Sequence, residues 1–263
     1  MTMQHRPRGI VLTVVSSFAV VLSAWSTAKA VDVFHLDFSV EDDFVTPLVN
    51  GQDISTPPEF GNILSISSIG NQHRGPAIFD STPGGPNAGG QDPDLLVSLG
   101  NILILQSTTA QTQTIPGIFN TPNDDADGGT FVFDFLSPIR LNSIDVIDID
   151  NPQQGVVLTL TDGALLTRTY TVPSNWTKDI FNVPTADGYE TLDLQTLAPQ
   201  PGEGGGSATA VEQAGFNPDD VRRMTAHYLG SGALDNLKFV PEPSTLLLLG
   251  AFVPVVLRRR ARS

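Results

Sequence analysis

The chain has 263 residues, enough for one large or two small domains, with 28 acidic and 14 basic side chains and a formal net charge of −14. Both ends are basic, so residues 31–240 hold 27 acidic and 7 basic groups, a net charge of −20. Such a body repels phosphate backbones and anionic lipid, which argues against nucleic-acid binding, whereas it suits divalent cations. The absence of cysteine excludes disulfides, thiolate zinc sites, iron–sulfur clusters and cysteine nucleophiles.

Residues 1–30 have the organisation of a secretory signal peptide. A basic start with Arg6 and Arg8 precedes the apolar run IVLTVVSSFAVVLSAW, and Ala28 and Ala30 form a small-x-small cleavage site. We predict cleavage after Ala30 and export of the remaining chain. An N-terminal membrane anchor or a core helix is the alternative interpretation of the apolar run.

Residues 31–240 alternate apolar and polar side chains over short runs separated by Gly and Pro, which favours a single all-β sandwich domain. In the first run, Phe34, Leu36, Phe38 and Val40 share one face. The other predicted strands are NILSIS, DLLVSLGNILILQ, GTFVFDFL, LNSIDVIDID, VVLTLT, LLTRTYTV and ALDNLKF. Asp162-Gly163 predicts a tight hairpin turn after VVLTLT.

Two stretches rich in Gly and Pro, 81–94 and 198–220, interrupt this pattern. They fit either linkers or long loops of one domain, and we favour loops because strand patterns continue on both sides. The residues that follow the second stretch fit a short helix or a strand. Alternation of Met224, Ala226 and Tyr228 favours the strand.

The acidic segment NDDADGGTFVFD is a candidate calcium loop. Asn123, Asp125, Asp127 and Gly128 fall at positions 1, 3, 5 and 6 of the calcium-loop pattern, and Asp134 falls at position 12. Oxygen ligands at alternate positions can surround a hard cation. Because position 1 is Asn, position 12 is Asp and no helices flank the segment, a solvated acidic turn is the alternative.

Other carboxylates lie at predicted strand ends. Asp92 and Asp94 follow an apolar segment that ends in Asp80, and a returning loop would bring the three towards one spot. In SIDVIDID the alternation changes phase midway, which predicts a bulge that re-aims Asp148 or Asp150. Each group also fits a turn or a charged edge that prevents aggregation.

The last predicted strand, ALDNLKF, places Asp235 on the same face as Ala233, Leu237 and Phe239. A lone carboxylate beside core residues is costly unless it is paired or bound to a metal. The alternative is a turn-capping role, in which Asp235 accepts backbone N–H bonds.

Asp235-Asn236 after a Gly-Ser-Gly turn, together with the acidic first strand, resembles galactose-binding-like jelly rolls and related carbohydrate-binding modules. The resemblance implies that the first and last strands are adjacent and that carboxylates from both hold a structural calcium. The ligands it implies are Asp235 with Asp37 or Glu41.

Residues 241–263 combine three parts. Pro241, Glu242 and Pro243 disfavour helix and present an extended backbone. The apolar run 244–257 is shorter than the roughly 20 residues of a usual membrane helix. Arg258, Arg259 and Arg260 follow it and would keep the C-terminus in the cytoplasm. A C-terminal core helix with a basic end is the alternative.

This order of parts resembles the PEP-CTERM sorting signal of Gram-negative bacteria, with a short hydrophobic sorting helix. The resemblance implies export, an inner-membrane-tethered intermediate and processing by a transpeptidase-like membrane enzyme, exosortase. It further implies a final place at the cell surface or in the extracellular matrix, in association with extracellular polysaccharide.

Catalytic motifs are absent: the sequence has no G-x-S-x-G elbow, H-E-x-x-H pair, phosphate-binding loop or dinucleotide fingerprint. His35, His73 and His227 have no triad partners at suggestive spacing, and Trp176 is the one tryptophan after the signal peptide. We therefore predict a non-enzymatic extracellular protein with a jelly-roll-like body over residues 31–240 and calcium as its candidate cofactor. A carbohydrate-binding module and a polysaccharide hydrolase or lyase are the alternatives.

Overall fold

The computed structural model describes residues 33–241 except positions 42, 44, 55–59, 61–62, 71–72, 91, 150–154, 181 and 184–185. Several predicted features lie outside the described residues: the signal peptide with Ala28 and Ala30, Asp150, and the sorting-signal residues Glu242, Pro243, Arg258, Arg259 and Arg260. Pro241 is the last residue of the final strand.

The described chain is all-β, as predicted, and every strand pairing is antiparallel. The strands are β1 (Phe34–Leu36), β2 (Leu64–Ile69), β3 (His73–Asp80), β4 (Asn101–Ser107), β5 (Gly129–Ile147), β6 (Val156–Asp162), β7 (Thr167–Val172), β8 (Tyr189–Asp193), β9 (Gln200–Pro201), β10 (Ser207–Glu212), β11 (Val221–Tyr228) and β12 (Ala233–Pro241). A single 3-10 turn, η1 (Pro93–Leu95), is the one helical element in this part of the chain. None of the helical structure described is long and apolar enough to cross a membrane.

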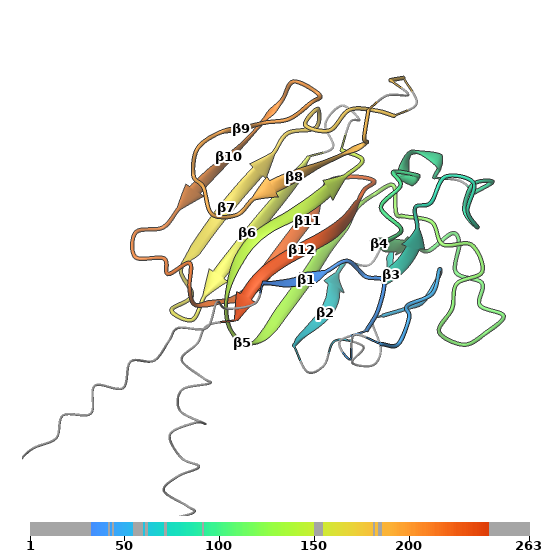
Figure 1. Ribbon diagram of the computed structural model, residues 1–263, viewed down its shortest axis with the longest axis horizontal. Helices are drawn as coiled ribbons and strands as arrows, with labels where there is room; N and C mark the ends of the chain where they lie inside the picture. The colour runs from blue at the N-terminus through green and yellow to red at the C-terminus, as the bar shows by residue number, and fades with distance from the viewer. Residues whose placement is uncertain are drawn as a thin grey trace, which may run out of the picture. The chain divides into compact units, whose positions relative to one another are not determined.

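Strand β5 connects two layers of the sheet. Its first half pairs with β2 and β11, and its second half pairs with β8 and β12. From β11 the pairing continues through β6, β7 and β10 to β9, and from β12 it continues through β4 to β3, with β1 beside the end of β12 (Figure 1). Because one long strand belongs to both layers, all twelve strands form one hydrogen-bonded network in a sandwich-like arrangement.

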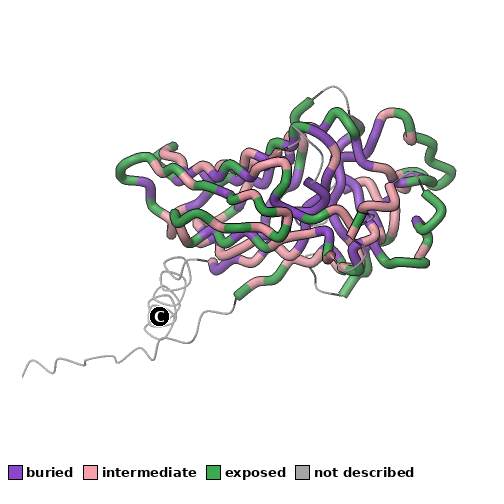
Figure 2. Tube along the Cα trace, turned by 90° about the horizontal axis from the view of Figure 1, so that it is seen from above, coloured by how far each residue is buried: buried purple, intermediate pink, exposed green. Residues whose placement is uncertain are grey.

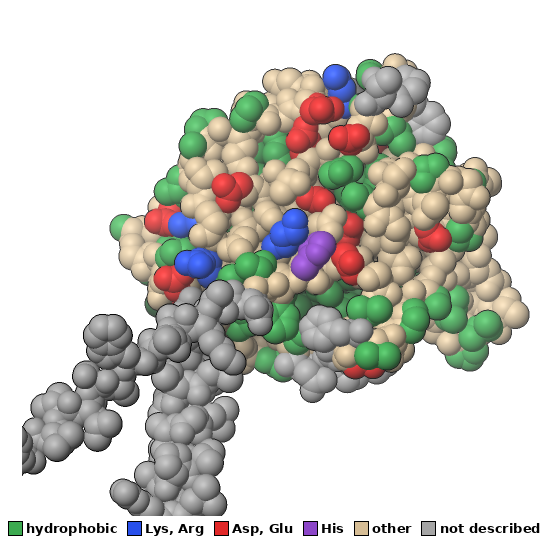
Figure 3. Space-filling view, viewed as in Figure 1, with side chains coloured by type: hydrophobic (Ala, Val, Ile, Leu, Met, Phe, Trp, Pro, Cys, Tyr) green, Lys and Arg blue, Asp and Glu red, His purple; other side chains and the backbone are tan. Residues whose placement is uncertain are grey.

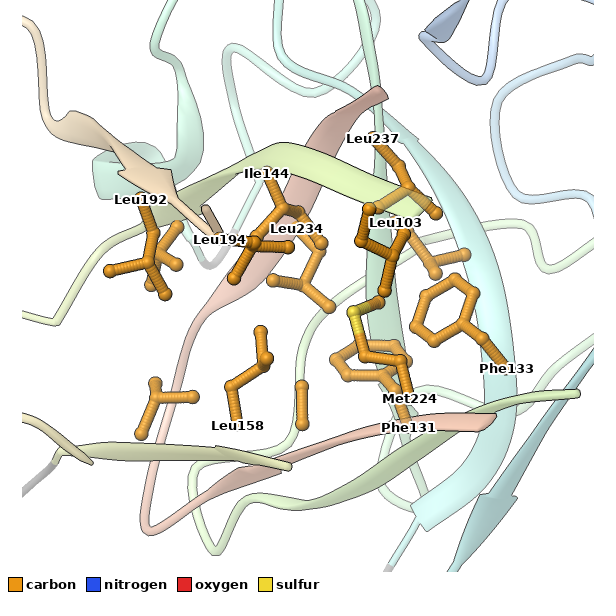
Figure 4. Close-up of a cluster of buried hydrophobic side chains, with 14 of the residues drawn as sticks. Leu103, Phe131, Phe133, Ile144, Leu158, Leu192, Leu194, Met224, Leu234 and Leu237 are labelled. Atoms are coloured by element: carbon orange, nitrogen blue, oxygen red, sulfur yellow. The ribbon is translucent and has the colours of Figure 1, made fainter. Parts of the chain in front are cut away.

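The main core fills the space between these layers. Leu158 of β6 and Met224 of β11 face Ile144, Leu192 and Leu234 from the other layer (Figure 4). Burial of every second residue along β6 follows from its alternating sequence VVLTLTD, because successive side chains of a strand point to opposite faces. Each fully buried aliphatic side chain contributes about 1.5–3 kcal/mol relative to an exposed one.

A second core lies on the outer face of β3 and β4. Strand β4 is buried on both faces: Leu103 packs in the main core, whereas Ile102 and Ile104 pack with Leu95 and Val97 from the loop before the strand. Buried residues therefore occur beneath the loops as well as between the layers (Figure 2). The Gly- and Pro-rich segment after β3 covers the outer face of the sheet and then leads into β4.

The structure corrects four details of the predicted strands. Of DLLVSLGNILILQ, the first part is η1 and a loop, so β4 begins at Asn101. Phe38 takes φ 53°, so β1 ends at Leu36 and the predicted alternation through Val40 is broken. The predicted strands 129–136 and 141–150 join in one strand, β5, which ends at Ile147, because no turn separates them. The predicted loop 198–220 contains β9 and β10. The short Ala-containing strand β10 is held by pairing with β7 and β9 rather than by deep burial.

Candidate functional site

Six aspartates are buried in the described chain, and this is the most unusual chemical feature of the molecule. They are Asp124, Asp125, Asp145, Asp148, Asp162 and Asp235, all 7% exposed or less. On the face seen in Figure 3, acidic side chains (red) form several separate small groups, so the high negative charge is dispersed over that surface. A buried carboxylate needs hydrogen bonds, a positive partner or a proton, and the six differ in which of these they have.

Asp162 has a structural role in the predicted hairpin turn. Its Oδ1 accepts the N–H groups of Ala164 and Leu166, each at 2.9 Å, and its Oδ2 accepts the N–H of Asn217 at 2.9 Å. These bonds fix the turn between β6 and β7, so the carboxylate is buried with its acceptors satisfied.

Asp235 is the opposite case. Its side chain is fully buried in β12, and neither carboxylate oxygen has a hydrogen-bond partner. Removal from water raises the pKa of Asp235 to about 8; the N–H of Asn236 acts in the opposite direction, and the charges of Asp145 and then Asp37 also raise this pKa. At neutral pH without a cation, Asp235 therefore holds a proton.

The predicted face of Asp235 is corrected by the structure. Asn236 takes φ 51°, and the register of β12 against β5 shifts between Asp235 and Lys238. Asp235 therefore shares the outer face with Ala233, whereas Leu237 and Phe239 point into the main core.

Asp145 of β5 lies directly opposite Asp235 in the strand register. Its Oδ1 accepts the hydroxyl of Thr191 at 2.6 Å, and its Oδ2 accepts the side-chain amide of Asn236 at 2.8 Å. Two carboxylates at opposed positions repel each other when both are ionised. The sequence prediction did not select Asp145, although its alternation with Ile144 and Val146 already indicated the outer face.

The predicted partners of Asp235 from the first strand differ in their positions. Asp37 influences Asp235 electrostatically, and its Oδ1 accepts the backbone N–H of Ser39 at 3.1 Å and its hydroxyl at 2.6 Å. Glu41 lines an apolar pocket that includes Phe60 and Phe239. Strands β1 and β12 are adjacent, as the jelly-roll resemblance implied.

Three residues of the candidate calcium loop are bonded to different protein groups. Asp134 lies on β5 and forms an ion pair with Arg223, with Nε–Oδ1 at 2.5 Å and Nη2–Oδ2 at 3.0 Å. Asp125 accepts the N–H of Asp127 at 3.0 Å, and Asn123 donates its amide to the carbonyl of Asp124 at 3.0 Å. Asp127 is exposed.

Two of the other predicted acidic groups meet at Asp124, a residue that the sequence prediction did not select. Asp92 Oδ2 accepts the N–H of Asp124 at 2.9 Å, and Asp148 shares a contact with Asp124 through Ser231. Asp148 takes φ 55° just after β5, which ends at Ile147, so the structure has a strand end where a bulge was predicted. Asp80 instead accepts the N–H of Thr82 in its own loop.

Within the described residues, no group of three or more His, Asp or Glu side chains is arranged to hold a metal ion. A cation at Asp145 and Asp235 would therefore have two carboxylates, with backbone, amide or water oxygens completing the six to eight ligands that calcium takes. The Nε2 of His35 lies 2.5 Å from the Oδ1 of Asn236 at the edge of this site, and His227 contacts Thr130 elsewhere.

Two comparisons with known proteins found no match to this chain. No family model matches it, and no curated protein matches it.

Proposed function

We propose that this chain is an exported, surface-sorted, non-enzymatic β-sandwich protein of jelly-roll type whose sheet is stabilised by a calcium ion at Asp145 and Asp235. The observation that carries the proposal is Asp235, a fully buried carboxylate with two unpartnered oxygens directly opposite a second buried carboxylate. The charge of Asp37 also acts on Asp235.

A divalent cation solves the electrostatic problem of this pair. Calcium binds oxygen ligands in flexible geometry, and both oxygens of Asp235 are available for it. Binding would replace the proton on Asp235, so affinity would rise with pH up to about 8. The ion would join β5 to β12 on the outer face, in a protein without cysteine that cannot use disulfides for this purpose.

The location of the protein is proposed from its two ends. The predicted signal peptide supports export, and the PEP-CTERM-like tail supports an inner-membrane-tethered intermediate that an exosortase-type enzyme processes. An acidic body that binds calcium would also bridge to anionic extracellular polysaccharide at the cell surface or in the matrix. This gives the calcium ion a second role, in addition to stabilising the fold.

The carbohydrate-binding and hydrolase alternatives gain less support. A sugar-binding platform uses exposed aromatic rings, but Trp176 is buried and the large exposed hydrophobic residues in the described part of the chain are all aliphatic. A second proposal on sugar chemistry would need an open cleft with two carboxylates.

Thermal unfolding with calcium and then with chelator tests the proposal. Calcium at about 100 times its dissociation constant adds roughly 2.7 kcal/mol, which corresponds to about 5–10 °C in Tm for a domain of this size. Asp235→Asn should lose this shift, whereas the exposed Asp187→Asn should keep it. An unchanged wild-type Tm, or an equal shift in Asp235→Asn, would overturn the assignment of the site.

A further inference from the structure

The arginines of the acidic body gather at one end of the sandwich. Residues 31–240 hold five arginines, and four of them lie where β7 and β11 begin and where β6 and β12 finish: Arg140, Arg168, Arg222 and Arg223. The four ion pairs between described residues all involve these arginines. Much of the acidic charge at this end is therefore paired, in a body whose net charge is −20.

The last described residue of the chain lies at the same end. Pro241 pairs with Ile139 of β5, and Val221, the first residue of β11, pairs with the same Ile139 from the other side (Figure 1). The predicted sorting signal therefore starts beside the arginines. We call this region the exit end and define it by Leu136, Arg140, Leu165, Arg222 and Arg223.

Two of the most exposed large hydrophobic side chains belong to the exit end. Leu165, in the turn between β6 and β7, is 79% exposed, and Leu136 of β5 is 62% exposed. The turn lies against the start of β11, since the N–H of Gly163 donates to the carbonyl of Asp220 at 3.1 Å. Basic (blue) and hydrophobic (green) side chains lie together at the lower left of the face in Figure 3, near the end of β12. Exposed aliphatic side chains beside arginines are typical of surfaces that enter lipid headgroups.

The arginines of the exit end are held loosely by their partners. The contact of Arg140 with Asp219 is 3.6 Å, longer than a hydrogen bond, and the side chain is 43% exposed. Arg222 and Arg223 are about half exposed and pair with partly exposed aspartates. Exposed ion pairs contribute little, so a guanidinium can exchange its carboxylate for a lipid phosphate, which it binds through two parallel N–H donors.

We infer that the exit end rests on the membrane surface while the chain is tethered, with its two leucines among the headgroups and its arginines on lipid phosphates. This inference rests on the membrane-tethered intermediate of the proposed function and adds the orientation of the body. The body as a whole is repelled by anionic lipid, so the end with paired charges is the part that can approach closely. A tether that starts at Pro241 also holds this end near the membrane and raises its effective concentration there.

Site-specific labelling of the full-length chain in vesicles of phosphatidylethanolamine and phosphatidylglycerol tests this orientation. The chain has no cysteine, so a polarity-sensitive dye can be placed on Leu136→Cys, Leu165→Cys or Leu229→Cys alone. Leu229 is the matched control, because it is 53% exposed and follows the other end of β11, roughly 25 Å from Val221. Vesicles should reduce acrylamide quenching severalfold at positions 136 and 165 and leave it unchanged at 229.

Charge reversal provides a second comparison. Arg222→Glu with Arg223→Glu should restore quenching of the dye at position 165, whereas Arg74→Glu, outside the exit end, should not.

The outcomes separate this inference from the proposed function. A chain that floats with vesicles but is quenched equally at all three positions would overturn the orientation and leave the tether intact. A chain that does not float would overturn the tethered intermediate and the orientation with it. Protection of positions 136 and 165 without vesicles would show that a second copy covers the exit end, which would also overturn the inference.

Discussion

Replacement of Asp235 by asparagine should change how the stability of the protein depends on pH. The pKa of Asp235 in the folded chain is about 8, against an ordinary value of 3.8. Each unit of difference corresponds to 1.36 kcal/mol, so about four units correspond to roughly 5 kcal/mol between the two protonation states. Because the folded form holds the proton over this range, the free energy of unfolding should fall as the pH rises from about 4 to about 8, and the loss should then be complete.

Asp235→Asn removes this titration but leaves an amide without partners in the same buried position. The protonated carboxyl of the wild type is equally without partners, so the two proteins should have similar stability at pH 4. At pH 8 without calcium the variant should be more stable by roughly 5 kcal/mol, so the two stability curves should diverge as the pH rises.

Urea unfolding at each pH unit from 4 to 8, in chelator, measures both curves. Asp187→Asn is the control, because Asp187 is exposed and its replacement should shift the curve by less than about 0.5 kcal/mol. If the curve of Asp235→Asn runs parallel to that of the wild type, Asp235 does not carry the pH dependence and the electrostatic reasoning fails.

Three further substitutions test the packing. Gly128 has φ 70° and an added Cβ would lie 2.4 Å from a backbone oxygen of β11, so Gly128→Ala should lower the free energy of unfolding in urea by about 2–4 kcal/mol. Gly84→Ala, at φ 77° with open space around it, should cost about 1 kcal/mol. Equal costs for the two variants would contradict the contact at Gly128. Trp176 is buried and donates its ring N–H to a backbone carbonyl at 2.9 Å, so Trp176→Phe should cost about 2 kcal/mol, and a neutral result would place the indole outside the core. The ion pair between Asp134 and Arg223 is largely exposed, so Arg223→Ala should change stability by less than about 1 kcal/mol at 0.15 M salt; a loss above 2 kcal/mol would show a tighter pair.

Much of the fold could be predicted because alternation reports burial locally. The runs in β6, the first half of β5 and residues 224–228 of β11 have apolar residues at every second position, and these became core residues. Prediction failed where backbone conformation breaks the period, at Phe38 and Asn236, since nothing in a two-residue period indicates a positive φ. It also failed for β10, whose small side chains carry little burial signal.

The candidate site could be predicted only in part. Asp235 was selected because a carboxylate in an apolar strand is anomalous, and its burial is confirmed. Asp145 and Asp124 were missed, because a carboxylate in an alternating strand or an acidic loop has an ordinary sequence pattern. Their importance arises from the residues that face them.

The sequence by itself determined the all-β class, the concentration of acidic charge in the body, the absence of disulfides and the motifs at the two ends, because composition and local periodicity carry these properties. Only the tertiary structure decided which carboxylates meet. Asp145 contacts Asn236 across 91 positions, and Asp92 contacts Asp124 across 32. Such contacts depend on strand register, on the bulge in β12 and on the path of a long loop, and these result from packing of the whole chain.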